Sequence, residues 1–275
     1  MKTLYVSDLD GTLFNSQIRV SAYTADVLNR CIEKGMLFAA ATARMPYDCD
    51  YLLSDINLAL PNILGNGALL YSFKPEKALS VQSMTPESAL AAIEAFNNHG
   101  QSCFVYTWRN DGIHLFYGDD ALKAQTQYYF SRALKACAEV TMEKDLTAAV
   151  CKGGPFYLAL SGSGETLIPI RDEIQAIPGV GLAFYLNIYN RKYCIEVFSK
   201  TAGKKPALQK LRDYVNCDEI VVFGDNLNDL PMIEIADRSY ATGNALDIVK
   251  ERVNDVLLDC DHDGVARFLE KEIAI

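Results

Sequence analysis

The sequence predicts an α/β fold with a mostly parallel sheet, interrupted by an inserted α+β segment. Near both ends of the chain, short buried apolar runs alternate with amphipathic helical patterns, which is typical of βαβ units. The middle third instead carries β-rich runs joined by turns, which indicates an antiparallel sheet. Acidic residues follow apolar runs at residues 8–10 and 225–229. The carboxyl ends of parallel strands are where α/β folds place their sites.

Composition narrows the possible functions. The chain has 275 residues, half of them apolar, so it can build one large or two modest domains. Its net charge of −9 and pI near 4.9 argue against a nucleic-acid partner or an anionic membrane surface. An anionic substrate stays possible, because a bound metal can reverse the local sign of the charge.

No targeting or membrane segment is expected. The apolar run after Lys2 ends at Asp8, too short for a secretory signal, and residues 36–42 are far short of a membrane span. The eight cysteines include no Cys-x-x-Cys pair and predict reduced thiols in a cytoplasmic protein, without disulfides or a zinc site.

The first part of the core is predicted over residues 1–82. A strand at residues 4–6 precedes a helix that Ser21 can cap and Gly35 can end. A second strand at residues 36–41 completes a βαβ unit. Asn66-Gly67, between apolar runs at residues 61–64 and 69–71, predicts a hairpin.

The inserted domain is predicted over residues 83–192. A helix opens at Thr85-Pro86, and a hairpin turns at residues 109–112. The other elements expected here are a helix at residues 120–137, a strand at 156–161, a helix at 164–176 and a strand at 181–187, which pairs with the next strand at 193–198.

The second part of the core is predicted over residues 193–275. A helix spans residues 204–215, and an apolar strand at 220–223 enters Gly224–Asp229. Strands at 239–242 and 256–258 and helices from about 246 and 264 complete it.

Asp8 and Asp10 predict a metal site. On an extended segment their side chains would point the same way. At about 4 Å and an effective dielectric of about 20 they repel by about 4 kcal/mol, so a cation should lie there. Carboxylate oxygens suit Mg²⁺. The alternative is that they only cap or turn the strand end.

Other residues extend this site. Asp225 and Asp229 could supply the remaining oxygen ligands, or they could belong to an ordinary turn and helix cap. Lys204 and Lys205 lie at a helix start, which the helix dipole disfavours for cations unless an anion is near; a solvated surface pair is the alternative. The Thr42 hydroxyl and the Arg44 fork could bind phosphate, although Thr42 is also an ordinary helix starter.

These residues resemble the motifs of the haloacid dehalogenase superfamily of phosphotransferases. The similarity lies in Asp8–Leu13, Thr42, Lys204 and Gly224–Asp229. A closer resemblance, to the Cof-like sugar-phosphate phosphatases, comes from the position of the insertion and three short motifs: Asn66–Ala68, Gly243–Ala245 and Asp263-Gly264. The resemblance implies a Rossmann-like, mostly parallel three-layer core with an inserted α+β cap domain.

The resemblance also implies catalytic roles. Asp8 would be the nucleophile that takes the phosphoryl group, and Asp10 the general acid and then the base for water. Thr42 would hold a phosphoryl oxygen, and Lys204 would neutralise nucleophile and phosphate. Lys205-Pro206 departs from the family's usual small residue, which leaves open whether Lys204 or Lys205 reaches the site.

By the same resemblance, Mg²⁺ would bind Asp8, Asp225 and the main-chain carbonyl of Asp10, supported by Asp229. Asn228 would contact the phosphate. The remaining substrate-binding or phosphate-binding positions are Leu9, Ala43 (where the subfamily commonly has glycine), Arg44 and Asn66.

The expected function is Mg²⁺-dependent hydrolysis of small phosphorylated metabolites, with sugar phosphates as the expected class, through an aspartyl phosphate on Asp8. The alternatives are a phosphomutase or phosphotransferase with the same intermediate, and an inactive binding protein of the same fold. A monomer or a homodimer is expected. In the insertion, Asn187, Tyr189 and Arg191 are expected to face the substrate. Structural or surface roles are expected for the remaining candidates: His99, Trp108, His114 and His262.

Overall fold

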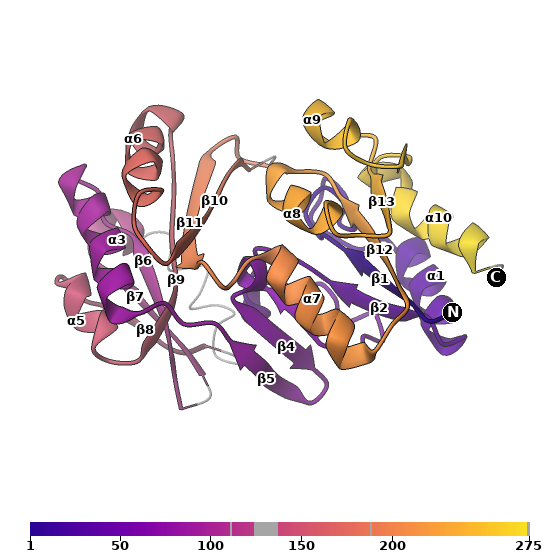
Figure 1. Cartoon of the computed structure of the whole chain (residues 1–275), viewed down its shortest axis with the longest axis horizontal. Helices are drawn as coiled ribbons and strands as arrows, with labels where there is room; N and C mark the ends of the chain where they lie inside the picture. The colour runs from indigo at the N-terminus through magenta and orange to yellow at the C-terminus, as the bar shows by residue number, and fades with distance from the viewer. Residues whose placement is uncertain (111, 124–136, 188, 274–275) are drawn as a thin grey trace. The chain divides into compact units, whose positions relative to one another are not determined.

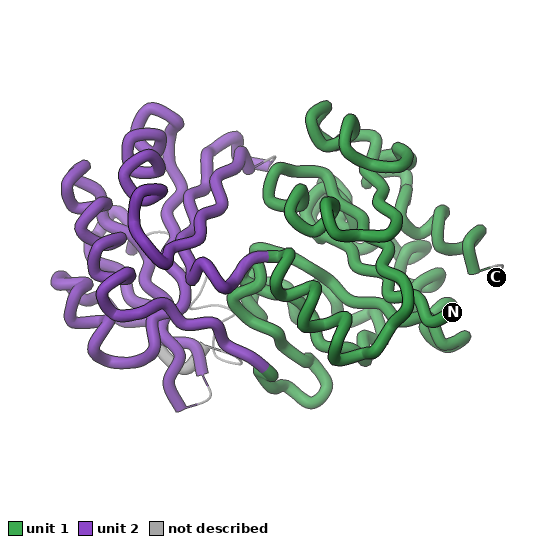
Figure 2. The backbone as a smooth tube through the Cα atoms, in the orientation of Figure 1, with its two compact units in different colours: residues 1–79, 204–275 green, residues 80–203 purple. Residues whose placement is uncertain are grey.

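The structure is a computed structural model that describes residues 1–110, 112–123, 137–187 and 189–273. The chain divides into two compact units, which Figure 2 colours separately: residues 1–79 with 204–275 form unit 1, and residues 80–203 form unit 2. Within the described residues, no helix combines the length and the apolar character needed to cross a membrane.

Unit 1 is built on a five-stranded parallel sheet with the order β14-β13-β12-β1-β2. Its strands, visible in Figure 1, are β1 (Thr3–Ser7), β2 (Leu37–Ala40), β12 (Glu219–Gly224), β13 (Arg238–Ala241) and β14 (Asp255–Val256). The apolar runs near both ends of the sequence form this sheet, so the predicted parallel core is confirmed.

The register of the central strands positions the site. Ser7 lies opposite Phe223 on β12 and opposite Ala40 on β2. The Asp8 amide donates to the Phe223 carbonyl at 2.9 Å, and the Ala41 amide donates to the Ser7 carbonyl at 2.8 Å. Residues that follow these three strands therefore leave the sheet at the same edge.

Helices cover both faces of this sheet. Alternation along β12 sends Val222 into a core with Leu208 and Leu211 of α7 (Lys204–Val215). The next residue, Phe223, points to the opposite face and meets the Phe268 ring of α10 (Gly264–Glu272), with ring centroids 5.5 Å apart. The other helices of the unit are α1 (Ala22–Glu33), α2 (Pro46–Cys49), α8 (Leu230–Ile233) and α9 (Asp247–Lys250).

The predicted signals at the ends of α1 are confirmed. The Ser21 side chain accepts a hydrogen bond from the Thr24 amide at 2.9 Å. Gly35 ends the helix with φ of +94°, a left-handed conformation that glycine adopts without steric cost. The helix α10 packs against α1, and the Tyr23 hydroxyl of α1 donates to Glu270 of α10 at 2.6 Å.

A small sheet adjoins β2. Its strands are β3 (Asn62–Leu64), β4 (Leu69–Phe73) and β5 (Glu76–Val81), and a 3₁₀ turn, Gly65–Gly67, joins the first two. Because β3 and β4 pair in antiparallel fashion, the predicted hairpin is confirmed. The strand β5 was not predicted from the sequence.

Unit 2 contains a six-stranded sheet with the order β10-β11-β9-β6-β7-β8. Its pairs are antiparallel except β7 with β8. The elements are α3 (Pro86–Asn98), β6 (Phe104–Arg109), β7 (Gly112–Tyr117), β8 (Cys137–Met142), α5 (Leu146–Val150), β9 (Gly154–Gly162), α6 (Gly164–Ile174), β10 (Val180–Leu186) and β11 (Tyr193–Ser199).

Some predictions for this segment differ from the structure. The hairpin of β6 with β7 is confirmed, whereas β8 and α5 were not predicted. Most of the helix expected at residues 120–137 lies outside the described residues. The insertion was expected to end at residue 192, but β11 pairs with β9 and β10, so this strand belongs to unit 2.

Candidate active site

Asp8 lies where β1 meets a tight turn. It directly follows the last residue of the strand and is only 5% exposed. Gly11 takes φ of +81°, which allows the chain to reverse. The Gly11 carbonyl accepts hydrogen bonds from Thr242 Oγ1 at 3.0 Å and from Asn244 Nδ2 at 2.7 Å. The turn after the predicted nucleophile is thus held by residues from the end of the chain.

The second acidic loop follows β12. Asp229 is fully buried, and its Oδ2 accepts the backbone amides of Asp225 at 2.9 Å and Asn226 at 3.0 Å. Gly224 makes this approach possible, since a Cβ there would lie 2.7 Å from the Asp229 Cβ. Two backbone amides of the loop therefore orient Asp229, and the absence of a side chain at Gly224 leaves room for it.

Lys204 joins the two acidic segments. It begins α7, is 2% exposed, and its Nζ donates to Asp8 Oδ1 and to Asp229 Oδ1, both at 2.6 Å. Lys205 points elsewhere and pairs with exposed Glu234 at 3.6 Å. The lysine that reaches the acids is therefore Lys204.

The cluster brings three carboxyl groups together with one ammonium group. Carboxylate oxygens of Asp8, Asp225 and Asp229 all lie within 4.8 Å of one another, and all three residues are buried. Burial, then Asp229, raises the pKa of Asp8 to about 8 even though Lys204 acts to lower it. Burial, then Asp8 and Asp229, raises the pKa of Asp225 well above its usual value.

For Lys204, burial and the neighbouring carboxylates act on the pKa in opposite directions. Burial acts to lower its pKa, but Asp229 and Asp8 overcome that effect and raise it above the ordinary lysine value, so the ammonium stays charged. One ammonium cannot balance three carboxylates. The donor set of carboxylate oxygens therefore fits Mg²⁺, a hard cation that takes oxygen ligands.

The Asp10 carboxylate does not join this cluster. Its two oxygens accept from Arg44, Oδ2 from Nε at 2.7 Å and Oδ1 from Nη2 at 2.6 Å. Leu9 lies in a turn directly after the strand end, so the expectation that Asp8 and Asp10 point the same way stays a prediction. Strand alternation does not apply within a turn.

The remaining predicted residues form a polar chain at the same sheet edge. Thr42 is buried, and its Oγ1 accepts the Arg44 amide at 3.1 Å. The Asn66 amide donates to the Thr42 carbonyl at 2.9 Å, and Asn228 Nδ2 donates to Asn66 Oδ1 at 3.1 Å. Ala43 is half-buried beside them.

Leu9 and Thr12 also lie in the segment that follows β1. The Leu9 side chain is fully buried, so this residue can serve a ligand only through its backbone. Thr12, which had no role assigned from the sequence, donates from Oγ1 to Asp225 Oδ1 at 3.3 Å. Thr242 and Asn244 were likewise not given roles. A polar residue at a strand's carboxyl end, the signal that identified Thr42, also marks Thr242.

The histidines form other contacts. His99 Nε2 lies 2.9 Å from Glu173, and His262 Nδ1 lies 2.7 Å from Asp259. His114 is 5% exposed, with its Nδ1 3.4 Å from Arg109 Nη2. Among the described residues, the group of acidic and imidazole ligands at the site includes none of the three.

Asn187 organises the turn between β10 and β11. Its Oδ1 accepts the Tyr189 amide at 2.9 Å, and the Arg191 amide donates to the Asn187 carbonyl at 3.0 Å. Their expected contact with substrate stays a prediction.

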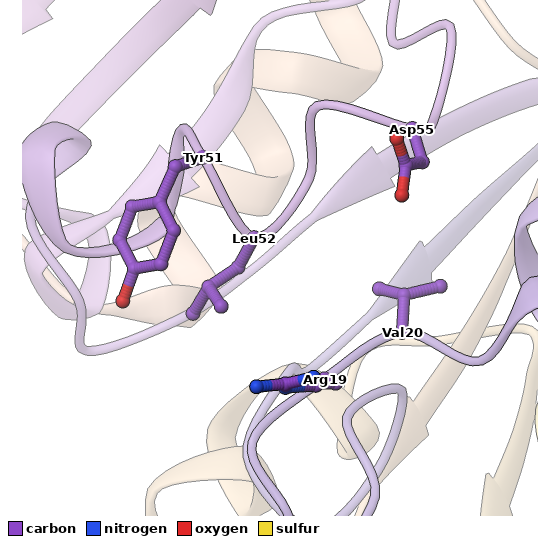
Figure 3. A pocket seen from close by; sticks show the side chains of 5 residues that line it. All are labelled: Arg19, Val20, Tyr51, Leu52 and Asp55. Carbon is purple, nitrogen blue, oxygen red and sulfur yellow. The ribbon is translucent and has the colours of Figure 1, made fainter.

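A separate pocket of about 260 Å³ lies on unit 1. Figure 3 shows Arg19 and Val20 on one segment, facing Tyr51, Leu52 and Asp55 on another. None of the predicted site residues lines it.

Comparison with known proteins identifies the family. Residues 5–269 match the model of the haloacid dehalogenase-like hydrolases. A 5-amino-6-(5-phospho-D-ribitylamino)uracil phosphatase of Bacillus subtilis is 26% identical, with 96% of each chain covered. An HMP-PP phosphatase of Klebsiella pneumoniae is 28% identical, with 98% of this chain and 95% of the relative covered.

Solved structures of other proteins are similar to this chain in fold. A Thermotoga maritima protein is 26% identical with a TM-score of 0.74, covering 98% of this chain and 97% of its own. A Streptococcus mutans protein shares the fold at 20% identity, with a TM-score of 0.80 and all of both chains covered. The chain therefore belongs to the haloacid dehalogenase-like hydrolases, in the Cof-like group, and is a phosphatase.

Proposed function

We propose that this chain is a Mg²⁺-dependent phosphatase of small phosphorylated metabolites that carries the phosphoryl group on Asp8. The observation that carries the proposal is the buried contact of Lys204 with both Asp8 and Asp229, inside a cluster of three carboxylates. The relatives named above are phosphatases of small phosphorylated molecules, which supports the substrate class.

The charge arrangement suits attack on a phosphate ester. A carboxylate and a phosphate dianion repel each other, so the site must neutralise charge before they can react. Lys204 does this from Asp8 Oδ1, which makes Oδ2 the candidate attacking atom. Mg²⁺ held by Asp8 and Asp225, with Asp229 in support, would neutralise further charge on the transferring group.

The reaction then proceeds in two steps. Asp8 attacks phosphorus, the bond from phosphorus to the leaving oxygen breaks, and Asp10 gives that oxygen its proton. Water next attacks the phosphorus of the aspartyl phosphate, Asp10 takes the water's proton, and free phosphate and the Asp8 carboxylate result. Covalent catalysis of this kind divides one difficult hydrolysis into two easier steps.

Phosphate release by the variants Asp8→Asn and Asp10→Asn tests this proposal. Asp8→Asn should abolish turnover, and Asp10→Asn should slow it by at least about 100-fold, the usual contribution of a general acid or base. Removal of Mg²⁺ with EDTA should stop wild-type turnover, and added Mg²⁺ should restore it. Wild-type rates in Asp8→Asn would exclude the nucleophile assignment.

We further propose that the inserted segment, predicted as residues 83–192, selects the leaving group. The test measures kcat/KM of the Asn187→Ala and Arg191→Ala variants on a panel of sugar and nucleotide phosphates. A changed order of preference supports the proposal, whereas a uniform loss on all substrates contradicts it.

A further inference from the structure

We propose that Arg44 is the positioning residue for the general acid: it holds the Asp10 carboxylate in the orientation from which the proton is delivered. This inference rests on the proposed function, because it assigns a role relative to Asp10. It differs from the sequence-based expectation that Arg44 binds phosphate.

The pair has the geometry of a fixed fork. Two different guanidinium nitrogens of Arg44, Nε and Nη2, each reach a different oxygen of Asp10, at 2.7 and 2.6 Å. A bidentate pair of this kind fixes the plane of the carboxylate as well as its distance. The side chains are 17% and 29% exposed, so the pair is largely shielded from solvent.

Arg44 is itself held on other sides. Its Nη1 donates to the Asp48 carbonyl at 3.1 Å, and its guanidinium lies 5.6 Å from the centroid of the Phe14 ring. Phe14 is fully buried, and its amide donates to the Leu9 carbonyl at 2.7 Å. The guanidinium therefore contacts Phe14, which is itself bonded to the turn that follows Asp8.

The backbone of Arg44 is fixed as well. Its amide donates to Thr42 Oγ1 at 3.1 Å, and its carbonyl accepts the Gly65 amide at 3.0 Å. A rigid arginine of this kind reduces the orientations that Asp10 can take, and orientation is a major part of catalytic rate.

The fork is compatible with proton transfer. Each carboxylate oxygen has two acceptor positions, so Arg44 uses one on each oxygen and leaves the second to carry the proton. Arg44 thus constrains Asp10 without blocking its role as acid or base.

The test compares leaving groups. Because kcat/KM reports the steps up to phosphoryl transfer, it responds to the acid only when the leaving oxygen needs a proton. p-Nitrophenol leaves as a stable anion, whereas the alcohol of an alkyl phosphate such as glycerol phosphate does not. Arg44→Met should therefore lose about 10-fold or more in kcat/KM on glycerol phosphate beyond any loss on p-nitrophenyl phosphate.

Two further variants sharpen the test. In Asp10→Asn protein, adding Arg44→Met should cause little further loss, because both changes remove the same function. Arg44→Lys should recover part of the selective loss by supplying a single donor. Arg30→Met is the matched control: Arg30 forms ion pairs with Asp26 and Glu270 on helices of the same unit and should leave both substrates unaffected.

Equal losses of Arg44→Met on the two substrates would overturn the inference, as would losses that add fully to those of Asp10→Asn. A raised KM with unchanged kcat on both substrates would assign Arg44 to phosphate binding instead, and would also overturn it. Failure of the proposed function is distinguishable, since the wild type would then release no phosphate from either substrate or Asp8→Asn would remain active.

Discussion

Gly224→Ala tests whether the approach of Asp229 to the β12 loop sets the geometry of the site. The added methyl group would lie 2.7 Å from the Asp229 Cβ and 2.8 Å from its Cγ and Oδ2. Ordinary contact begins near 3.4 Å, so one partner has to move by about 0.7 Å. Asp229 has little room to move, because its oxygens accept from Lys204, Asp225 and Asn226.

The size of the effect follows from this displacement. Overpacking of a buried position costs about 1–3 kcal/mol, which corresponds to a fall in Tm of roughly 3–10 °C for a unit of this size. A shift of nearly 1 Å at a catalytic site can cost up to about 100-fold in rate. We therefore expect kcat/KM to fall by about 10- to 100-fold.

Calorimetry and a phosphate-release assay measure the two effects. Gly162→Ala is a matched control at the end of β9, because a Cβ there would meet Leu167 at an ordinary 3.4 Å. It should change neither measurement beyond its error. The reasoning fails if Gly224→Ala keeps both the Tm and the kcat/KM of the wild type.

Three other predictions concern charge and exposure. Lys204→Met should lower the free energy of unfolding of the Mg²⁺-free protein by about 3–5 kcal/mol in urea titrations, because it leaves buried carboxylates unpaired. Lys205→Met, at a partly exposed residue, should change it by less than about 1 kcal/mol. The pKa of Asp8 is raised to about 8, mainly by burial. The folded protein therefore keeps a proton on Asp8 that the unfolded chain releases near pH 4. The Tm in EDTA should therefore fall as pH rises from about 5 to about 8, and saturating Mg²⁺ should reduce the slope. Cys151 is exposed, whereas Cys103 is buried and burial raises the pKa of its thiol, so peptide mass spectrometry should show iodoacetamide on Cys151 first.

The parallel core was predictable because local pattern and global order agree there. Residues 4–6, 36–41 and 220–223 are apolar runs bounded by turn residues, and each becomes a buried strand. Once these strands are parallel, residues that follow them share one edge of the sheet. The meeting of Asp8 with Asp225 across more than 200 residues needs only this rule.

The partner of the Asp10 carboxylate was not predictable in the same way. Its two oxygens accept from Arg44, 34 residues further along the chain, and no local pattern connects these positions. Arg44 was noted for its fork, but nothing in the spacing says whether the fork meets a carboxylate of the chain or a phosphate. In unit 2, α5 spans only five residues, too few for a helical pattern to stand out in the sequence.

The polar motifs near the end of the sequence act mainly as braces for the first turn. Thr242 and Asn244 both donate to the Gly11 carbonyl. Asp263 accepts from Ser21 Oγ at 2.5 Å and from Thr24 Oγ1 at 2.9 Å, which ties the start of α1 to the start of α10. Each such hydrogen bond contributes about 1 kcal/mol.

Their combined effect is on geometry as much as on stability. The Gly11 turn lies between the predicted nucleophile and α1. Thr242 and Asn244 hold the turn itself, and Asp263 holds the start of α1. A site that must hold carboxylate oxygens within 4.8 Å of one another needs such bracing, because like charges would otherwise move apart. The late motifs therefore accompany the acidic motifs for a physical reason, although none of these brace residues contributes an oxygen to the carboxylate cluster itself.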